Sequence, residues 1–123
     1  MNDVETTTAR EIALFTELGA HPDRHHGVIL IPKSEVRPLL GALLGRGTRI
    51  LGLDGFKRLP DNKIQPFMEF SPDYSDAQPS ERDIETFLAS VPDKISHFEV
   101  VVDLETSNQI SHRTVDPWRV NVR

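Results

Sequence analysis

The chain has 123 residues, a net charge of −5 and no cysteine. This length suits one domain with its own hydrophobic core, so we expect residues 1–123 to form a single domain. The lack of cysteine excludes disulfide frameworks, thiolate metal sites and cysteine nucleophiles. The N-terminus is polar and acidic where a secretory signal would be basic and then apolar, and the longest apolar run, "GVILIP", is too short to span a bilayer. We therefore expect a cytoplasmic protein that does not insert into membranes.

The charges are unevenly distributed along the chain. Residues 69–85 carry six acids and one base, whereas residues 33–63 carry seven bases and three acids. The overall negative charge disfavours nucleic-acid binding, because phosphate contacts need a basic surface. The acidic segment fits either an ordinary solvated surface or a docking face for a basic partner.

The first part of the chain predicts two helices separated by a strand. Residues 9–18 carry apolar side chains at helical spacing and precede Gly19, where the helix is expected to end. "HPDRHH" is then expected to be a loop. "GVILIP" (27–32) is rich in β-branched residues, as in a strand covered on both faces. A second helix is predicted with Ser34 as its N-cap, because apolar residues then recur at helical spacing up to "GRG".

The stretch "RILGLDGFKRLPDNKIQPFMEF" (49–70) holds two glycines inside a strand-like run. Asp54-Gly55 is a type I′ hairpin signal, whereas "PDNK" would reverse the chain later and pair longer apolar strands. We favour the later reversal, with Gly52 and Gly55 bending the strand and Gly55 at a bulge. A phosphate-binding loop is disfavoured, because no helix follows to supply its N-terminus.

A third helix is predicted after Ser80, its N-cap, with acids in its first turn. Its apolar stripe consists of Ile84, Phe87, Leu88 and Val91. "HFEVVVDL" (97–104) alternates between apolar and polar residues and is the strongest predicted strand. The tail from Glu105 is expected to be irregular, adding a short strand or lying over the surface.

Apart from the first helix and the tail, this order is β-α-β-β-α-β. It predicts an α+β fold of the ferredoxin-like type, with a four-stranded antiparallel sheet and two helices on one face. In that topology the first and third strands are central. The second face of the apolar 27–32 strand would then need cover from the N-terminal helix, the tail or a partner.

No established catalytic spacing is present in the sequence. Asp54, Glu69 and Asp103 are the carboxylates expected on strands. On neighbouring strands they would be able to bind a metal or act as an acid–base pair, although strand carboxylates more often point to water. A metal-dependent enzyme is therefore kept as a minor alternative.

A local histidine cluster occupies the first loop. His21, His25 and His26 lie there together with Asp23. Without cysteine or distant matched ligands, adventitious metal affinity is a better interpretation than a built site. No metal and no other cofactor is predicted.

Tyr74 lies among carboxylates in the turn-rich segment "MEFSPDYSD" (68–76). An aromatic side chain surrounded by acids is a plausible interface anchor. The equally acceptable interpretation is an ordinary loop whose tyrosine packs onto the sheet.

Residues 27–76, "GVILIP…LLGALLGRGTRILGLDGF…KIQPFMEFSPDYSD", together with the closing "FEVVVDL", resemble small immunity proteins of bacterial polymorphic or contact-dependent toxin systems. In these an apolar strand and helix precede an "ILG-x-D/E-GF" strand and an "IQP…DFS/DYS" segment. The resemblance implies a catalytically inert binder that occludes a toxin, and it carries over no catalytic residue. Phe56 and Tyr74 match pattern positions that fit a core role equally well.

The predicted function is therefore a cytoplasmic antitoxin-type binding protein whose partner is a cognate toxin, for example a basic nuclease. The predicted partner-binding residues are Glu69, Asp73, Tyr74, Asp76, Glu81 and Asp83. The alternative from another class is a regulatory small-ligand module with the glycine-bearing strand lining a pocket. The sequence leaves open whether the chain forms a homo-oligomer.

Overall fold

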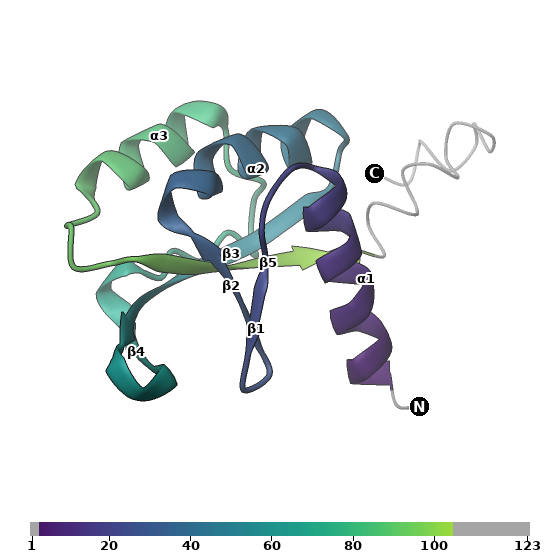
Figure 1. Cartoon of the computed structure of the whole chain (residues 1–123). Helices are drawn as coiled ribbons and strands as arrows, with labels where there is room; N and C mark the ends of the chain where they lie inside the picture. Colours follow the sequence, from purple (N-terminus) through teal and green to yellow (C-terminus); the bar gives the residue numbers. More distant parts are fainter. Residues whose placement is uncertain (1–2, 105–123) are drawn as a thin grey trace, which may run out of the picture.

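The computed structural model describes residues 3–104 (Figure 1). The helices in this part of the chain are α1 (Asp3–Glu17), α2 (Lys33–Gly45) and α3 (Glu81–Ser90), with short 3-10 helices η1 (Pro60–Asn62) and η2 (Met68–Phe70). The strands are β1 (Asp23–His25), β2 (Val28–Pro32), β3 (Arg49–Leu59), β4 (Lys63–Phe67) and β5 (His97–Asp103). None of the described helices is long and apolar enough to cross a membrane. The prediction for the tail from Glu105 lies outside the described residues.

The strands form one antiparallel sheet in the order β1-β2-β5-β3-β4. The α+β class is thus confirmed, but the four-stranded ferredoxin-like order is wrong. The last strand, β5, lies between β2 and β3, and β4 lies at an edge instead of the centre. The physical reason is that β5 has an alternating buried face, which suits a central strand, whereas β4 is mostly exposed and contains Pro66.

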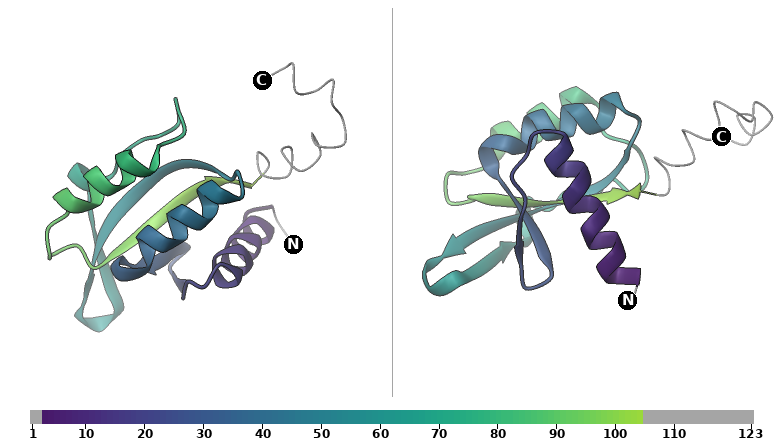
Figure 2. Two further views of the ribbon diagram at one scale, coloured as in Figure 1. Left: turned by 90° about the horizontal axis from the view of Figure 1, so that it is seen from above. Right: turned by 45° about the vertical axis from the view of Figure 1, so that its right-hand side comes forward.

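The main core lies between the sheet and the helices α2 and α3, which run side by side over one face (Figures 1 and 2). Phe98, Val100 and Val102 alternate into this core, as predicted. The ring of Phe98 meets Phe87 of α3 edge to face, with ring centroids 5.9 Å apart. Helix α1 lies apart from α2 and α3, beside the sheet, and contributes the fully buried Phe15 to the core.

Strand β1 is missing from the sequence-based prediction, which treated "HPDRHH" as a loop. It forms a hairpin with β2, in which His25 pairs with Val28. The two residues between them, His26 and Gly27, have φ values of 49° and 83°. A type I′ hairpin turn requires two successive positive φ values. His-Gly satisfies this requirement here, but it is a weaker sequence signal for such a turn than Asn-Gly.

The reversal after β3 occurs at Pro60–Asn62, as favoured, and Asp54-Gly55 remains inside the strand. Asp61 and Asn62 there have φ values of 64° and 61°, which aspartate and asparagine tolerate better than most residues. The predicted bulge is in a different place. The register between β3 and β5 shifts between Ile50 and Gly52, not at Gly55.

The two predicted helix caps have different outcomes. The Ser80 side chain accepts a hydrogen bond from the Asp83 N–H (3.0 Å), and Asp83 accepts one from the Ser80 N–H (2.9 Å), which makes a full capping box. The prediction for Ser34 is wrong, because α2 begins two residues earlier than expected, at Lys33, and Pro32 occupies the N-cap without a side-chain bond.

The outer edge of β4 is interrupted by a proline. Pro66 lies opposite Phe56, whose carbonyl accepts a hydrogen bond from Ser96 N–H just before β5. The N–H and C=O of Phe56 therefore face β5 and not β4. The backbone nitrogen and carbonyl of its partner Pro66 then face away from β3, out of the sheet. Because proline has no N–H, this edge position offers no donor to another strand.

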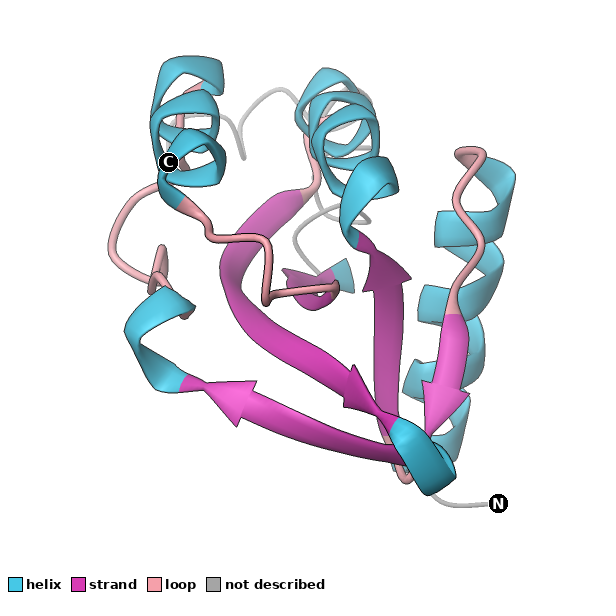
Figure 3. Ribbon diagram, turned by 60° about the vertical axis from the view of Figure 1, so that its left-hand side comes forward, coloured by secondary structure: helices cyan, strands magenta, loops and turns pink. Residues whose placement is uncertain are grey.

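The sheet curls around its second face, which is the face turned away from α2 and α3 (Figure 3). The strand register places Asp23, Leu30, His97, Phe56 and Arg58 on this face. An ion pair joins Asp23 of β1 to Arg58 of β3 across two intervening strands, which in a flat sheet would hold them roughly 14 Å apart. Leu30 is fully buried and Phe56 is 8% exposed, although both face away from α2 and α3. The strand 27–32 is thus covered on both faces, as predicted.

Candidate functional site

The acidic segment between β4 and α3 begins with a stretch that is bound directly to the edge of β3. Leu53 N–H donates to the Pro72 carbonyl (3.1 Å), and Tyr74 N–H donates to the Leu51 carbonyl (2.8 Å). These bonds continue the ladder of β3 beyond the point where β4 ends. The segment is therefore irregular in form but fixed in position.

Side chains fix the second half of the same segment. Gln78 accepts a hydrogen bond from Ile50 N–H (2.8 Å) and donates one to the Thr48 carbonyl (2.8 Å). Arg49 donates to Gln78 (2.9 Å) and to the Tyr74 carbonyl. Both ends of the loop thus bind the start of β3.

The two glycines of "GLDGF" allow this close approach. A Cβ atom at Gly52 would lie 2.9 Å from the Pro72 carbonyl oxygen, and one at Gly55 would lie 3.1 Å from the Phe70 carbonyl oxygen. The backbone of the acidic segment thus passes so close to Gly52 that a side chain there would force it to move, and a side chain at Gly55 would make a tight contact.

Two of the predicted partner-binding acids have structural partners. Asp73 accepts a hydrogen bond from Ser75 N–H (2.8 Å), and the bonds from Ser75 lower the pKa of Asp73. Bonds from the backbone and hydroxyl of Ser80 lower the pKa of Asp83 in the same way. Both side chains are exposed and ionised at neutral pH.

Glu69, Asp76 and Glu81 are also exposed, and within the described part of the chain they accept no hydrogen bond. The expectation that Glu69 lies on a strand is wrong, because it lies in η2. Nothing in the described contacts brings Glu69 to Asp76 or to Glu81. Glu69 and Asp76 thus carry solvated charge before α3 begins. Glu81 is the first residue of α3, and after the bond to Glu85 its charge also helps to raise the pKa of Arg37.

Tyr74 packs against the main core and is only partly exposed. Burial raises the pKa of its phenol, and the nearby carboxylate of Asp83 raises it further. The structure thus brings Tyr74 and Asp83 together, and it places the tyrosine at the base of the acidic segment rather than free at its surface.

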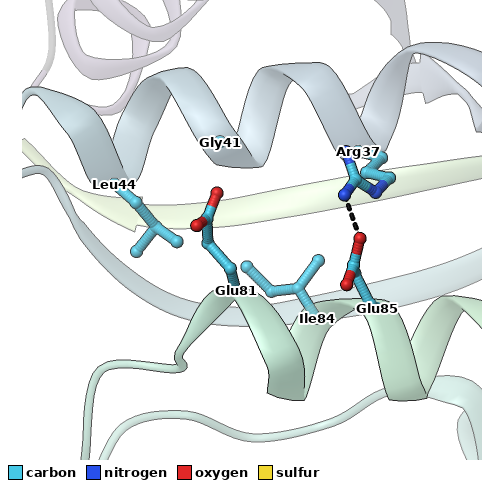
Figure 4. A pocket seen from close by; sticks show the side chains of 6 residues that line it. All are labelled: Arg37, Gly41, Leu44, Glu81, Ile84 and Glu85. Carbon is cyan, nitrogen blue, oxygen red and sulfur yellow. Dashed lines mark hydrogen bonds and ion pairs between the residues drawn. The ribbon is translucent and has the colours of Figure 1, made fainter.

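A small hollow with a volume of about 20 Å³ lies between α2 and α3, next to the acidic segment (Figure 4). Its lining residues are Arg37, Gly41, Leu44, Glu81, Ile84 and Glu85. An ion pair between Arg37 and Glu85 closes one end, and the Glu81 side chain points across the hollow toward Gly41. Sequence reasoning did not find this site, because its residues come from two helices that the fold places side by side.

The strand carboxylates meet in a combination that was not predicted. Asp54 lies directly opposite Glu99 on β5, and not beside Glu69. Burial raises the pKa of Glu99 to about 6, and the carboxylates of Asp54 and Glu11 contribute to the rise. Alternation places Asp103 on the same face of β5 as Glu99. Among the described residues no group of three or more such side chains has a geometry that could hold a metal ion.

The histidine cluster of the first loop is dispersed by the fold. His21 Nδ1 lies 2.7 Å from a Glu35 carboxylate oxygen, and Asp23 pairs with Arg58. His25 is buried, with its ring against that of His26 at a centroid distance of 4.4 Å. His21 and Asp23 therefore have partners on other elements, and only His25 and His26 remain in contact with each other.

His97 on the second face has a fixed hydrogen-bond environment. Its Nδ1 lies 2.8 Å from the Ser96 hydroxyl, which also accepts a bond from Arg58 N–H (2.9 Å). Burial and Arg58 lower the pKa of His97, and Asp23 acts in the opposite direction. Because Arg58 already donates to the hydroxyl oxygen, the hydroxyl hydrogen is free to point at Nδ1, which favours a neutral imidazole with its proton on Nε2.

A scan against protein-family models and searches of curated proteins and of solved structures found no match to this chain.

Proposed function

We propose that the chain is a non-enzymatic binding protein of the immunity type, which neutralises a cognate toxin through its acidic segment. The proposed contact residues are Glu69, Asp73, Tyr74, Asp76, Glu81 and Asp83. The partner expected from this charge is a basic protein such as a nuclease, for which complementary charges would speed association and disfavour wrong partners.

The observation that carries the proposal is the way the acidic segment is held. An exposed loop with several free carboxylates is usually mobile, but here the backbone at Pro72 and Tyr74 and the side chain of Gln78 bind it to β3. A surface that is already ordered loses less conformational entropy on binding. Rigid presentation of solvated charge suits recognition of a protein surface, and Glu69 and Asp76 accept no hydrogen bond within the described residues that would stabilise the fold.

The test is protection of a growing cell. The reading frame next to this gene is expressed in a bacterial host, alone and together with this chain. We expect the neighbouring product to stop growth and co-expression of the wild-type chain to restore it. Absence of toxicity, or toxicity that the wild-type chain does not relieve, would contradict the proposal.

The residue assignment is tested with charge reversals that spare the fold. Glu69→Lys combined with Asp76→Lys changes two exposed carboxylates that accept no hydrogen bond within the described part of the chain. We expect this variant to lose protection while its thermal melt stays near that of the wild type. Lys57→Glu, an exposed change on β3, is the matched control and should protect fully. Full protection by the double variant would move the binding surface elsewhere.

A further inference from the structure

Strand β4 carries apolar side chains on the second face of the sheet. Pro66 lies opposite Phe56 and Ile64 lies opposite Arg58, and residues paired across two strands share a face. Ile64 and Pro66 therefore face away from α2 and α3. Ile64 is partly exposed and Pro66 is exposed, so these two side chains lie at the surface and not in the core.

Met68 continues this apolar row beyond the end of β4. Its side chain is 75% exposed, and no other large apolar side chain in residues 3–104 is exposed. Phe67 and Phe70 on either side of it pack against the main core, so η2 turns Met68 and Glu69 outward. A single exposed apolar side chain is common on protein surfaces, but Met68 follows two others along the same edge of the sheet.

The short helix η2 is fixed in position. The Phe70 carbonyl oxygen passes so close to β3 that a Cβ atom at Gly55 would lie 3.1 Å from it. The Ser71 hydroxyl donates to the Phe67 carbonyl (3.3 Å), and the Lys94 ammonium lies 4.6 Å from the centroid of the Phe67 ring. Because its backbone is already ordered, the residue that η2 turns outward loses less conformational entropy when a partner covers it.

The charge beside the apolar row indicates the chemistry of the protein that would cover it. Glu69 follows Met68 directly, is exposed and accepts no hydrogen bond within the described part of the chain. Protein interfaces commonly have an apolar centre and a polar rim, and methionine is enriched in them because its flexible side chain adapts to the partner. A protein that covers this row therefore needs apolar side chains against Met68 and a cation near Glu69.

We propose that Ile64, Pro66 and Met68 form an apolar docking strip for the basic partner protein, whose apolar side chains pack on Met68 and whose lysine or arginine side chains lie against Glu69. The inference rests on the proposed function in one respect, namely that the partner is a basic protein. It extends the proposed interface from the acidic segment onto β4. In this arrangement the carboxylates speed association, and burial of the docking strip slows dissociation.

The test separates these two contributions by their rates. The purified product of the neighbouring reading frame is immobilised, and binding of the whole chain is followed by surface plasmon resonance. Met68→Gln keeps the length of the side chain but makes it polar. We expect this variant to dissociate roughly tenfold faster and to associate at the wild-type rate. Met68→Leu keeps the apolar character and should dissociate close to the wild-type rate.

Two further variants are the matched controls. Glu69→Gln should slow association at low ionic strength, and the difference should shrink at high ionic strength because salt screens exposed charges. Ala13→Gln makes an exposed apolar position of α1 polar, away from the docking strip, and should change neither rate. The thermal melts of all four variants should match the wild type, because the altered side chains are exposed. Wild-type dissociation of Met68→Gln, or equal losses with Met68→Leu, would overturn the inference.

Binding rates and protection of cells are measured separately, so the two proposals fail in different ways. Binding that Met68→Gln weakens, without protection by the wild-type chain, would remove the immunity function and keep the docking strip. Protection by the wild-type chain, with unchanged dissociation of Met68→Gln, would keep the function and overturn the docking strip. The lack of any complex between the wild-type chain and the neighbouring product would overturn both.

Discussion

Asp54 of β3 and Glu99 of β5 lie directly opposite each other, so two carboxylates share one position of the sheet. Glu99 is partly buried, and Glu11 of α1 adds a third negative charge nearby. Burial is the main reason why the pKa of Glu99 is raised to about 6, and the carboxylates of Asp54 and Glu11 add to the rise because like charges disfavour ionisation.

This pair predicts an unusual dependence of stability on pH. The folded-state pKa of Glu99 lies above its ordinary value of 4.5, so its contribution is complete below pH 4.5 and is lost as the pH rises through 6. Glu99→Gln should therefore raise the free energy of unfolding at pH 7 by about 1 kcal/mol, after discounting for solvent screening. It should have little effect at pH 4.5. Urea denaturation at both pH values measures this, with Glu69→Gln as the control, and an equal effect at both would contradict it.

His97 is expected to titrate below the ordinary histidine value, because burial and Arg58 disfavour its cation. The sign is opposite to that of Glu99: stability from a neutral His97 is present above pH 6.5 and is lost as the pH falls through the folded-state pKa. NMR titration of its ring should find the neutral form protonated at Nε2. Arg58→Ala should raise this pKa and Asp23→Asn should lower it. Shifts in the reverse directions would contradict the assigned contacts.

Gly52 and Gly41 should respond oppositely to the same substitution. Gly52→Ala places a Cβ atom 2.9 Å from a carbonyl oxygen, so the acidic segment must move, and we expect a loss of about 1–3 kcal/mol. Gly41→Ala meets open space in a helix interior and should gain about 0.5–1 kcal/mol. Guanidinium denaturation of the two variants compares them directly. A stable Gly52→Ala would mean that the contact with Pro72 is not formed.

The capping box of α3 should make a measurable contribution to stability. Ser80→Ala removes the acceptor for Asp83 N–H, and we expect it to reduce the free energy of unfolding by about 1 kcal/mol. Thr86→Ala, at an exposed position within the same helix, is the control and should be neutral or slightly stabilising. Thermal unfolding measures both variants. If Ser80→Ala melts with the wild type, the cap does not stabilise the helix.

The sequence predicts a cap or a turn correctly when all the residues that specify it are close neighbours in the chain. Ser80 with Asp83 three residues later, and Pro60–Asn62 with two residues tolerant of positive φ, are complete within a few residues and were located correctly. β1 was missed because three residues are too few to show an alternation, and its turn uses His26 instead of asparagine or aspartate.

The order of the strands depends on information that no short segment carries. The β-α-β-β-α-β order is compatible with several sheets, and the choice follows from which strand best fills the centre. For the same reason the sequence did not reveal Glu99 as the partner of Asp54, nor the hollow formed by Gly41 and Glu81. Each of these pairs joins residues that are far apart in the chain.

Pro66, on the edge strand of the sheet, affects how readily copies of the chain would associate through that edge in a crowded cell. β4 ends the sheet on one side, and a bare strand edge is a template for stacking identical copies into fibrils. Pro66 removes a donor from that edge, and beyond it the segment that includes Pro72 and Tyr74 already occupies the hydrogen bonds of β3. The same loop that presents the acidic charge therefore also protects the sheet against self-association and aggregation.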